Sequence, residues 1–164
     1  MIRPAEPSDA TAIAAIWNHY ILHTAVTFNP VPKSAEEVAA LTRAPHAFLV
    51  AEEAGRILGF ARHVQFRTGQ GYSRTAEHTI LLDPGATGRG HGRALLSAIL
   101  DDAATRGIGA MIAGVSAGNA AGLAFHTAMG FATVGHLPAV GWKDGRWLDL
   151  VLMQKRLAPP LSQG

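Results

Sequence analysis

The stretch Thr87–Arg93 reads TGRGHGR, and its residue types and spacing suit the binding of a phosphate. Glycine adopts positive φ without strain and lets a ligand approach the backbone closely. The first N–H groups of a helix lack partners within the helix, and its dipole adds partial positive charge there. Such a loop before a helix therefore favours anion binding. The residues that could contribute are Thr87, Gly88, Arg89, Gly90, His91, Gly92 and Arg93.

The residues on either side predict a strand before this loop and a helix after it. Ile80–Leu82 is apolar and is broken by Asp83-Pro84-Gly85. After the loop, apolar residues recur at the spacing of one buried helical face. They are Leu96, Ile99, Leu100 and Ala103. Gly107 then supplies a left-handed stop.

Two well-known phosphate motifs do not fit the loop. A Walker loop needs a Gly-Lys-Ser/Thr ending, which is missing here, and the GxGxxG pattern would need its third glycine one place after Gly92. The alternative to an anion site is an ordinary glycine-rich turn between a strand and a helix. Taken alone, the loop leaves both interpretations open.

Composition excludes several classes of protein. The chain has 164 residues, 48% hydrophobic and 16% charged, which predicts one globular domain over residues 1–157 with a flexible tail over 158–164. A net charge of +2 without a basic run argues against nucleic acid as a partner. There is no cysteine, so a thiolate zinc site and a cysteine nucleophile are ruled out.

Metal and membrane sites are not expected either. His19 and His23 have a zinc-compatible spacing, but no third ligand stands at a recognisable offset, and a polar helix face is the simpler interpretation. The first residues, MIRPAEPSD, contain no apolar signal region, and no apolar span is long enough to cross a membrane. We therefore expect a cytoplasmic protein without a metal cofactor.

Patterning along the chain predicts an alternation of strands and helices. A helix that Ser8 or Asp9 could cap carries an apolar stripe, and Ser34-Ala35-Glu36-Glu37 is a capping box for a second helix. Asn119 can cap a helix that runs to Met129. The expected strands are residues 1–3, 47–53, 57–66, 76–82, 110–116, 132–140 and 148–155.

This order of elements, together with the loop, resembles the GNAT N-acetyltransferases. Their loop for the pyrophosphate of acetyl-CoA is written Q/R-x-x-G-x-G/A, although Gly85 stands where that pattern has Gln or Arg. Further stretches are similar to the phosphinothricin N-acetyltransferase branch: residues 2–5 with 17–21, 72–79, 123–131 and 141–149. The resemblance implies an α+β fold, a central mixed and mostly antiparallel twisted sheet of about seven strands flanked by about four helices.

The resemblance also implies acetyl-CoA as cosubstrate and assigns residues to it. The strand backbone of Ile80, Leu81 and Leu82 would bind the pantetheine arm, with the Leu81 N–H polarising the acetyl carbonyl as oxyanion donor. The loop residues Thr87–Arg93 would bind the pyrophosphate, and Asn119 would contact the cofactor besides capping its helix.

Acetylation of an amino acid needs a base, because the ammonium has a pKa of about 8–10. Glu77, at the start of the central strand, is the best candidate, and the branch is thought to place its base there. His126 stands where many GNAT enzymes have a Tyr that protonates the thiolate, so it could act as acid or as an alternative base. An edge carboxylate and a structural histidine are the alternatives.

The branch implies a small amino-acid-like acceptor such as phosphinothricin, methionine sulfoximine or methionine sulfone, and a homodimer. Guanidinium groups suit its carboxylate, and Arg67 and Arg74 flank Tyr72 in the loop before Glu77, with Phe28 as an apolar wall. Trp142 and Trp147 could build this site, the dimer contact or the core. Another acceptor, such as a polyamine or a protein N-terminus, and a non-catalytic acyl-CoA sensor remain alternatives.

Overall fold

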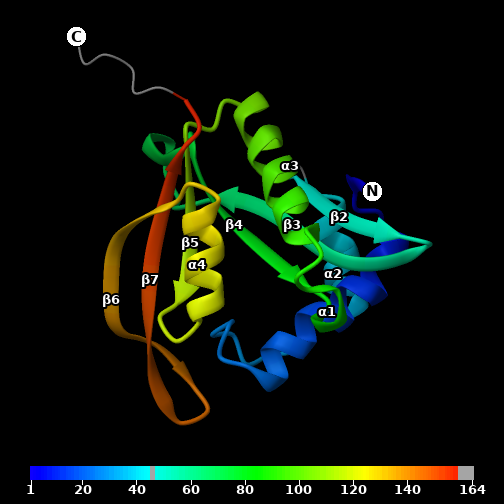
Figure 1. The fold of residues 1–164 in the computed structure, drawn as a ribbon, viewed down its shortest axis with the longest axis horizontal. Coiled ribbons are helices and arrows are strands. Elements are labelled where there is room, and N and C mark those ends of the chain that lie inside the picture. The colour runs from blue at the N-terminus through cyan, green and yellow to red at the C-terminus, as the bar shows by residue number, and fades with distance from the viewer. Residues whose placement is uncertain (45–46, 159–164) are drawn as a thin grey trace.

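The computed structural model describes residues 1–44 and 47–158, and these form seven strands and four α-helices (Figure 1). The predicted tail over 158–164 therefore lies outside the described residues except for Ala158. Along the chain the elements are β1 Ile2–Pro4, α1 Ala10–His23, α2 Ala35–Thr42, β2 Phe48–Glu53, β3 Arg56–Gln65, β4 Thr75–Leu82, α3 His91–Thr105, β5 Ala110–Ser116, α4 Ala120–Ala128, β6 Ala132–Lys143 and β7 Arg146–Arg156. Short 3-10 turns cover Pro7–Asp9, Gln70–Tyr72 and Pro84–Ala86.

All seven strands belong to one sheet in the order β1-β2-β3-β4-β5-β7-β6. Every neighbouring pair is antiparallel except β4 with β5, which is parallel. The predicted mixed and mostly antiparallel sheet is confirmed. None of the described helices is both long and apolar enough to cross a membrane.

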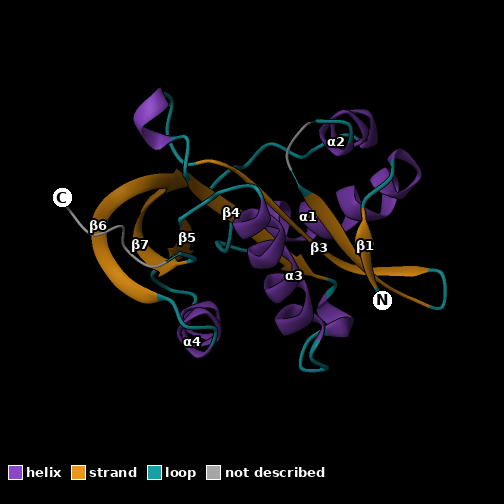
Figure 2. Cartoon of the chain, turned by 90° about the horizontal axis from the view of Figure 1, so that it is seen from above, coloured by secondary structure: helices purple, strands orange, loops and turns teal. Residues whose placement is uncertain are grey.

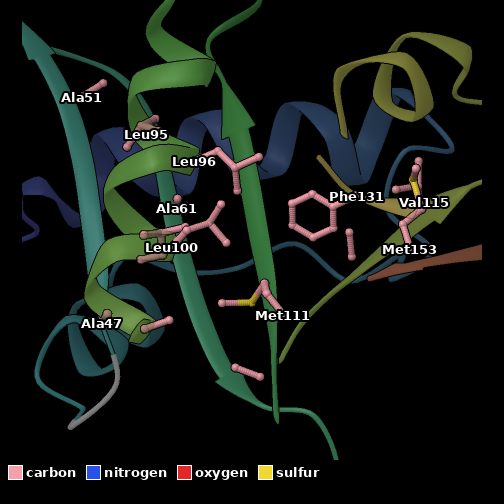
Figure 3. Packing of buried hydrophobic residues seen from close by; sticks show 14 of the residues in the cluster. Ala47, Ala51, Ala61, Leu95, Leu96, Leu100, Met111, Val115, Phe131 and Met153 are labelled. Atoms are coloured by element: carbon pink, nitrogen blue, oxygen red, sulfur yellow. The ribbon is translucent and has the colours of Figure 1, made fainter. Parts of the chain in front are cut away.

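The helices cover both faces of the sheet (Figure 2). On one face α3 and α4 bury a core that includes Leu95, Leu96 and Ile99. Figure 3 shows α3 packed on the strands through Leu95, Leu96 and Leu100. On the other face α1 and α2 bury a second core that includes Ile13, Trp17 and Phe60. The predicted stripes of α1 and α3 therefore mark the sides that face the sheet.

The predicted capping residues are confirmed for α2 and α4, whereas α1 begins without the predicted side-chain cap. Ser34 and Glu37 form the capping box of α2, and the Asn119 side chain accepts a hydrogen bond from the Gly122 N–H at the start of α4. For α1, neither Ser8 nor Asp9 makes a side-chain capping bond to the helix. The Asp9 carboxylate instead forms an ion pair with Arg3 and accepts the Glu6 N–H.

Candidate active site

A cleft opens where the two parallel strands of the sheet separate. β4 and β5 are paired only from Thr75 to Glu77, against Ala110 to Ile112, and diverge beyond that point (Figure 1). A cavity of about 360 Å³ fills the gap, and it is lined by β4, β5, α4 and the segment between α1 and α2. Because the gap passes through the sheet, side chains from both faces reach the same cavity.

Glu77 presents a carboxylate to this cleft. It faces the same side of the sheet as Leu81, which packs against α1, because alternate strand residues share a face. Burial raises the pKa of the Glu77 carboxyl. On β5 opposite, a Cβ added to Gly114 would lie 2.9 Å from Glu77 Oε1, so the glycine leaves the room that the carboxylate occupies. A carboxylate with a raised pKa in a cleft is suited to general base catalysis.

Two buried histidines contribute to the cleft from the other face of the sheet. The Nε2 atoms of His78 and His126 are 3.0 Å apart, and His126 Nδ1 is 2.8 Å from the Gly122 carbonyl oxygen. Since a carbonyl only accepts, His126 Nδ1 carries the proton and donates. In a neutral ring its Nε2 then accepts from His78 Nε2–H. Burial lowers the pKa of both histidines, most strongly for His78, so the pair is neutral.

This arrangement bears on the predicted role of His126. Both of its ring nitrogens take part in hydrogen bonds within the protein, and its side chain is buried. Burial also disfavours the protonated form that a general acid needs. The described geometry therefore favours Glu77 over His126 as the group that exchanges a proton with an acceptor amine.

The backbone donor at the cleft is Ile80 rather than Leu81. The Asp83 N–H bonds to the Leu58 carbonyl of β3, and Phe66 N–H bonds to the Thr75 carbonyl. Backbone groups alternate in direction along a regular strand, so the odd-numbered residues of β4 face β3. The Leu81 N–H consequently points toward β3, and this direction does not support its predicted role as oxyanion donor. The Ile80 N–H points to the edge where β5 has separated.

The segment between α1 and α2 forms a wall of the cleft and is held by β6. Lys143 is 3% exposed, and its Nζ donates to the carbonyls of Thr24 and Thr27 at 2.7 Å each. The Phe28 ring packs directly against the backbone of Gly141, where a Cβ on residue 141 would overlap the ring. The Phe28 ring is thereby held in place as a lining residue of the cleft, and its role as an apolar wall for the substrate stays a prediction.

The glycine loop leads into an uncapped helix N-terminus. Gly88 and Gly90 have φ of +75° and +85°, and Gly90 is the N-cap of α3 without a side-chain capping bond. The Nε2 atom of His91 is buried and has no hydrogen-bond partner among the described residues. Unsatisfied donors at this helix start fit an anionic group. Arg89 is partly neutralised by an ion pair with Glu53 at 2.8 Å.

The helix start also revises how the loop matches the pyrophosphate pattern. Because α3 begins at His91, Gly90 and Gly92 are the glycines beside its first turn. Counted from them, the Gln or Arg position of the pattern falls on Thr87 instead of Gly85. The Thr87 hydroxyl donates to the Pro84 carbonyl oxygen at 3.2 Å.

A larger hollow, of about 630 Å³, lies between α1 and the β2–β3 turn. Its charged residues are paired with one another: Arg3 with Asp9 and Glu52, and Arg56 with Asp83. None of the residues predicted to act in the site lines it. The chemistry therefore centres on the smaller cleft.

The sequence matches the family model "Acetyltransferase (GNAT) family" over residues 13–131. The chain belongs to the GNAT acetyltransferase family. Among its relatives, the L-amino acid N-acyltransferase MnaT of Escherichia coli (strain K12) is 39% identical over 160 residues, covering 95% of this chain and 93% of MnaT. The phosphinothricin N-acetyltransferase of Alcaligenes faecalis is 36% identical and covers 99% of this chain and 83% of that protein.

Solved structures of GNAT proteins agree with the fold. The yncA protein of Salmonella typhimurium, determined with its cofactor acetyl-CoA, superposes with a TM-score of 0.94 at 36% identity, covering 100% of this chain and 97% of its own. A phosphinothricin acetyltransferase from Sinorhizobium meliloti, in complex with acetyl-CoA, has a TM-score of 0.91 at 32% identity, covering 100% and 91%. This chain is thus a GNAT N-acetyltransferase, as the sequence predicted.

The structure brings together only part of the predicted GNAT site. The predicted residues that line the cleft are Phe28, Glu77, Ile80, Leu81, Asn119 and His126. Arg67, Tyr72 and Arg74 do not line it. These three are exposed in the loop before β4, where the Arg67 guanidinium lies 5.4 Å from the Tyr72 ring centroid. Their predicted contact with the substrate is not supported in the described chain, because the cleft opens beyond Glu77 in the opposite direction along β4.

Sequence reasoning missed several residues that shape the cleft. His78 stands in the stretch 72–79 that resembles the branch, but its contact with His126 depends on how β4 and α4 pack, and Gly114 is seen to face Glu77 only when β4 and β5 are aligned. Lys143 is 116 residues from the Thr27 carbonyl that it binds. No local signal marks Lys143, because a lysine beside the turn of an edge hairpin is ordinarily exposed.

Proposed function

We propose that this chain is an acetyl-CoA-dependent N-acetyltransferase whose acceptor is the amino group of a small amino acid of the phosphinothricin, methionine sulfoximine or methionine sulfone type. The observation that carries the proposal is Glu77, a half-buried carboxylate with a raised pKa in the gap between β4 and β5. The relatives named for acting on amino acids, phosphinothricin and methionine sulfoximine support the acceptor class.

In the proposed reaction Glu77 accepts a proton from the acceptor ammonium. The amine nitrogen then forms a bond with the acetyl carbon, and the Ile80 N–H stabilises the oxyanion of the tetrahedral intermediate. The carbon–sulfur bond breaks as that intermediate collapses, and the leaving thiolate takes up a proton from water. The nitrogen passes its second proton to solvent, which replaces the proton taken up by the thiolate. Glu77 then releases the first proton to solvent, so the overall reaction yields the amide, the free thiol and one proton.

We assign the pyrophosphate of the cosubstrate to the N-terminus of α3 and the loop Thr87–Arg93. Asn119 uses its Oδ1 to cap α4, which leaves its Nδ2 for the ligand. Acetyl-CoA supplies the activated acetyl group and the thiolate leaving group. Two observations support this placement. A Cβ added at Gly88 or Gly90 would meet no atom within 4 Å, so there is space at the helix start, and His91 Nε2 has no hydrogen-bond partner among the described residues.

A free-thiol release assay tests the proposal. Acetyl-CoA is combined with phosphinothricin, methionine sulfone, methionine sulfoximine, spermidine and a peptide N-terminus in turn. We expect turnover with at least one of the three amino acids. Turnover only with spermidine or the peptide would replace the acceptor, and binding of acetyl-CoA without turnover on any amine would favour a sensing role.

A further inference from the structure

A lysine stands on the wall of the cleft in a fixed position. The Lys33 Nζ lies 4.5 Å from the centroid of the Trp17 ring, and both residues line the cleft together with Glu77. The Asn18 side chain clamps the backbone of Lys33 from both sides: it accepts the Lys33 N–H and donates to the Lys33 carbonyl, each at 2.8 Å. The backbone from which the Lys33 side chain extends is therefore held by two hydrogen bonds.

Its ammonium has no carboxylate within ion-pair distance in the described part of the chain. The charge of Lys33 contributes to lowering the pKa of Glu37, but the Glu37 carboxylate accepts the Ser34 N–H in the capping box. An aromatic face is a weak partner for an ammonium compared with an anion. Lys33 can therefore take a carboxylate without giving up an existing ion pair.

The other cations near the cleft are otherwise engaged or lie outside it. Lys143 uses its ammonium on the carbonyls of Thr24 and Thr27. Arg62 lies over the Phe48 ring and does not line the cleft. Arg146 lines an adjoining hollow of about 390 Å³ that shares Asn119 with the cleft but does not include Glu77. Among the described residues, Lys33 is the lysine or arginine that lines the same cavity as the candidate base.

We propose that Lys33 binds the carboxylate of the acceptor and so restricts the enzyme to free amino acids. The inference rests on the proposed function, since it needs an acceptor amine at Glu77. An amino acid carries opposite charges on one carbon, and the cleft offers Glu77 to the amine and Lys33 to the carboxylate. A polyamine places a second positive charge toward Lys33, and a peptide N-terminus has no adjacent carboxylate, so both fit this cleft poorly.

The test compares an amino acid with its own carboxamide, for example methionine sulfone and methionine sulfone amide, by thiol release. A charged hydrogen bond is worth enough for a preference of about 10- to 100-fold in kcat/KM for the carboxylate. In Lys33→Met we expect the KM of the carboxylate form to rise by about that factor, with kcat and the amide little changed. Lys33→Arg should restore part of the preference, because it keeps the charge.

Several outcomes would overturn the inference while leaving the acetyltransferase proposal intact. These are equal use of acid and amide by the wild type, a preference that survives in Lys33→Met, or a preference lost in Arg146→Met instead. Calorimetric binding of acetyl-CoA by Lys33→Met at wild-type affinity shows that the variant is folded. If the wild type acetylates neither the acid nor the amide of any amino acid tested, the proposed function fails first and the inference falls with it.

Discussion

The position of the Glu77 carboxylate depends on a glycine on the neighbouring strand. Gly114 faces it across the gap, and a methyl group there would come within 2.9 Å of Glu77 Oε1. The obstructed atom is the end of a flexible side chain, so the carboxylate would turn away while the backbone stays in place. Gly114 is thus a positioning residue for the base.

We predict that Gly114→Ala lowers kcat by about 10-fold or more while its melting temperature stays close to that of the wild type. A misplaced base loses much of the 10²- to 10⁴-fold that general base catalysis contributes. Steady-state kinetics and a thermal melt measure the two quantities. Unchanged kcat in a folded Gly114→Ala would show that the glycine does not position Glu77.

The histidine pair makes stability depend on pH. Both histidines are neutral in the fold and have pKa values below the ordinary 6.5, whereas in the unfolded chain they titrate near that value. The native state therefore binds fewer protons than the unfolded state below about pH 6.5, and stability falls as the pH falls. Each such group lowers the free energy of unfolding further as the pH falls below 6.5, until its folded pKa is reached.

We expect denaturant unfolding to show a loss of stability between pH 7 and pH 5 that becomes smaller in His78→Phe. Phenylalanine keeps the ring contact with Phe131 but cannot take up a proton. The slope of unfolding free energy against pH is the quantity to compare, since the absolute stability of the variant will also change. An equal slope in both proteins would mean that His78 is not kept neutral by the fold.

At the scale of elements, the start of α3 carries the proposed cosubstrate site. Gly90 is in the left-handed region at φ +85°, where a β-branched residue is strained, and it precedes the first free N–H groups of the helix. Gly90→Val should therefore weaken acetyl-CoA binding, by about 10-fold or more in calorimetry. Gly55, also at positive φ in the β2–β3 turn, provides the matched control: Gly55→Val should bind acetyl-CoA normally.

Elements were predicted well where local patterns determine them. The stripes of α1 and α3, the capping box at Ser34 and the cap at Asn119 all act within a few residues, and β5 was predicted with its observed bounds. The site was predicted less well because it depends on strand pairing. Whether the N–H of Leu81 or that of Ile80 points to the cleft depends on the hydrogen bonds to β3 and on the separation of β5. Neither can be inferred from the residues of β4 alone.

The sequence also could not place the arginines. Arg67 and Arg74 are close to Glu77 along the chain, but a strand rises about 3.3 Å per residue and the cleft lies at its far side. Lys33, which is 44 residues from Glu77 by number, lines the same cavity. Proximity in sequence therefore does not indicate which charged residues line the cleft.

At the scale of the molecule, the edge strand β6 and its neighbour β7 present an exposed apolar surface. Trp142 and Trp147 are 56% and 61% exposed, and Val134 and Val140 are also exposed. Core packing therefore does not explain the tryptophans. An exposed edge with large apolar side chains favours association, which agrees with the homodimer that the sequence resemblance implied.

We predict a homodimer that forms through this surface. In analytical ultracentrifugation the wild type should sediment as a dimer, and the double variant Trp142→Ala, Trp147→Ala should shift toward the monomer. The Tyr72→Ala variant serves as a control, because Tyr72 is an exposed aromatic on a different loop. A dimer that is unaffected by the tryptophan changes would place the interface elsewhere.

The most direct test of the whole account is the pH dependence of thiol release in the wild type and in Glu77→Gln. Because burial raises the pKa of Glu77, wild-type kcat/KM should fall as the pH drops through that raised pKa. Glu77→Gln should be slower by about 10²- to 10⁴-fold at neutral pH, with the deficit shrinking as the pH rises and more amine is already free.

The same variant should unfold no more easily than the wild type at neutral pH. When the pKa of a carboxyl is higher in the folded state, the protein loses stability as the pH rises from the unfolded pKa to the folded pKa, because the buried group must ionise. The neutral amide of glutamine does not ionise and so avoids this loss. A folded Glu77→Gln that is slow at neutral pH and recovers toward alkaline pH is the predicted result. A folded Glu77→Gln with the rate and pH profile of the wild type would show that Glu77 is not the base.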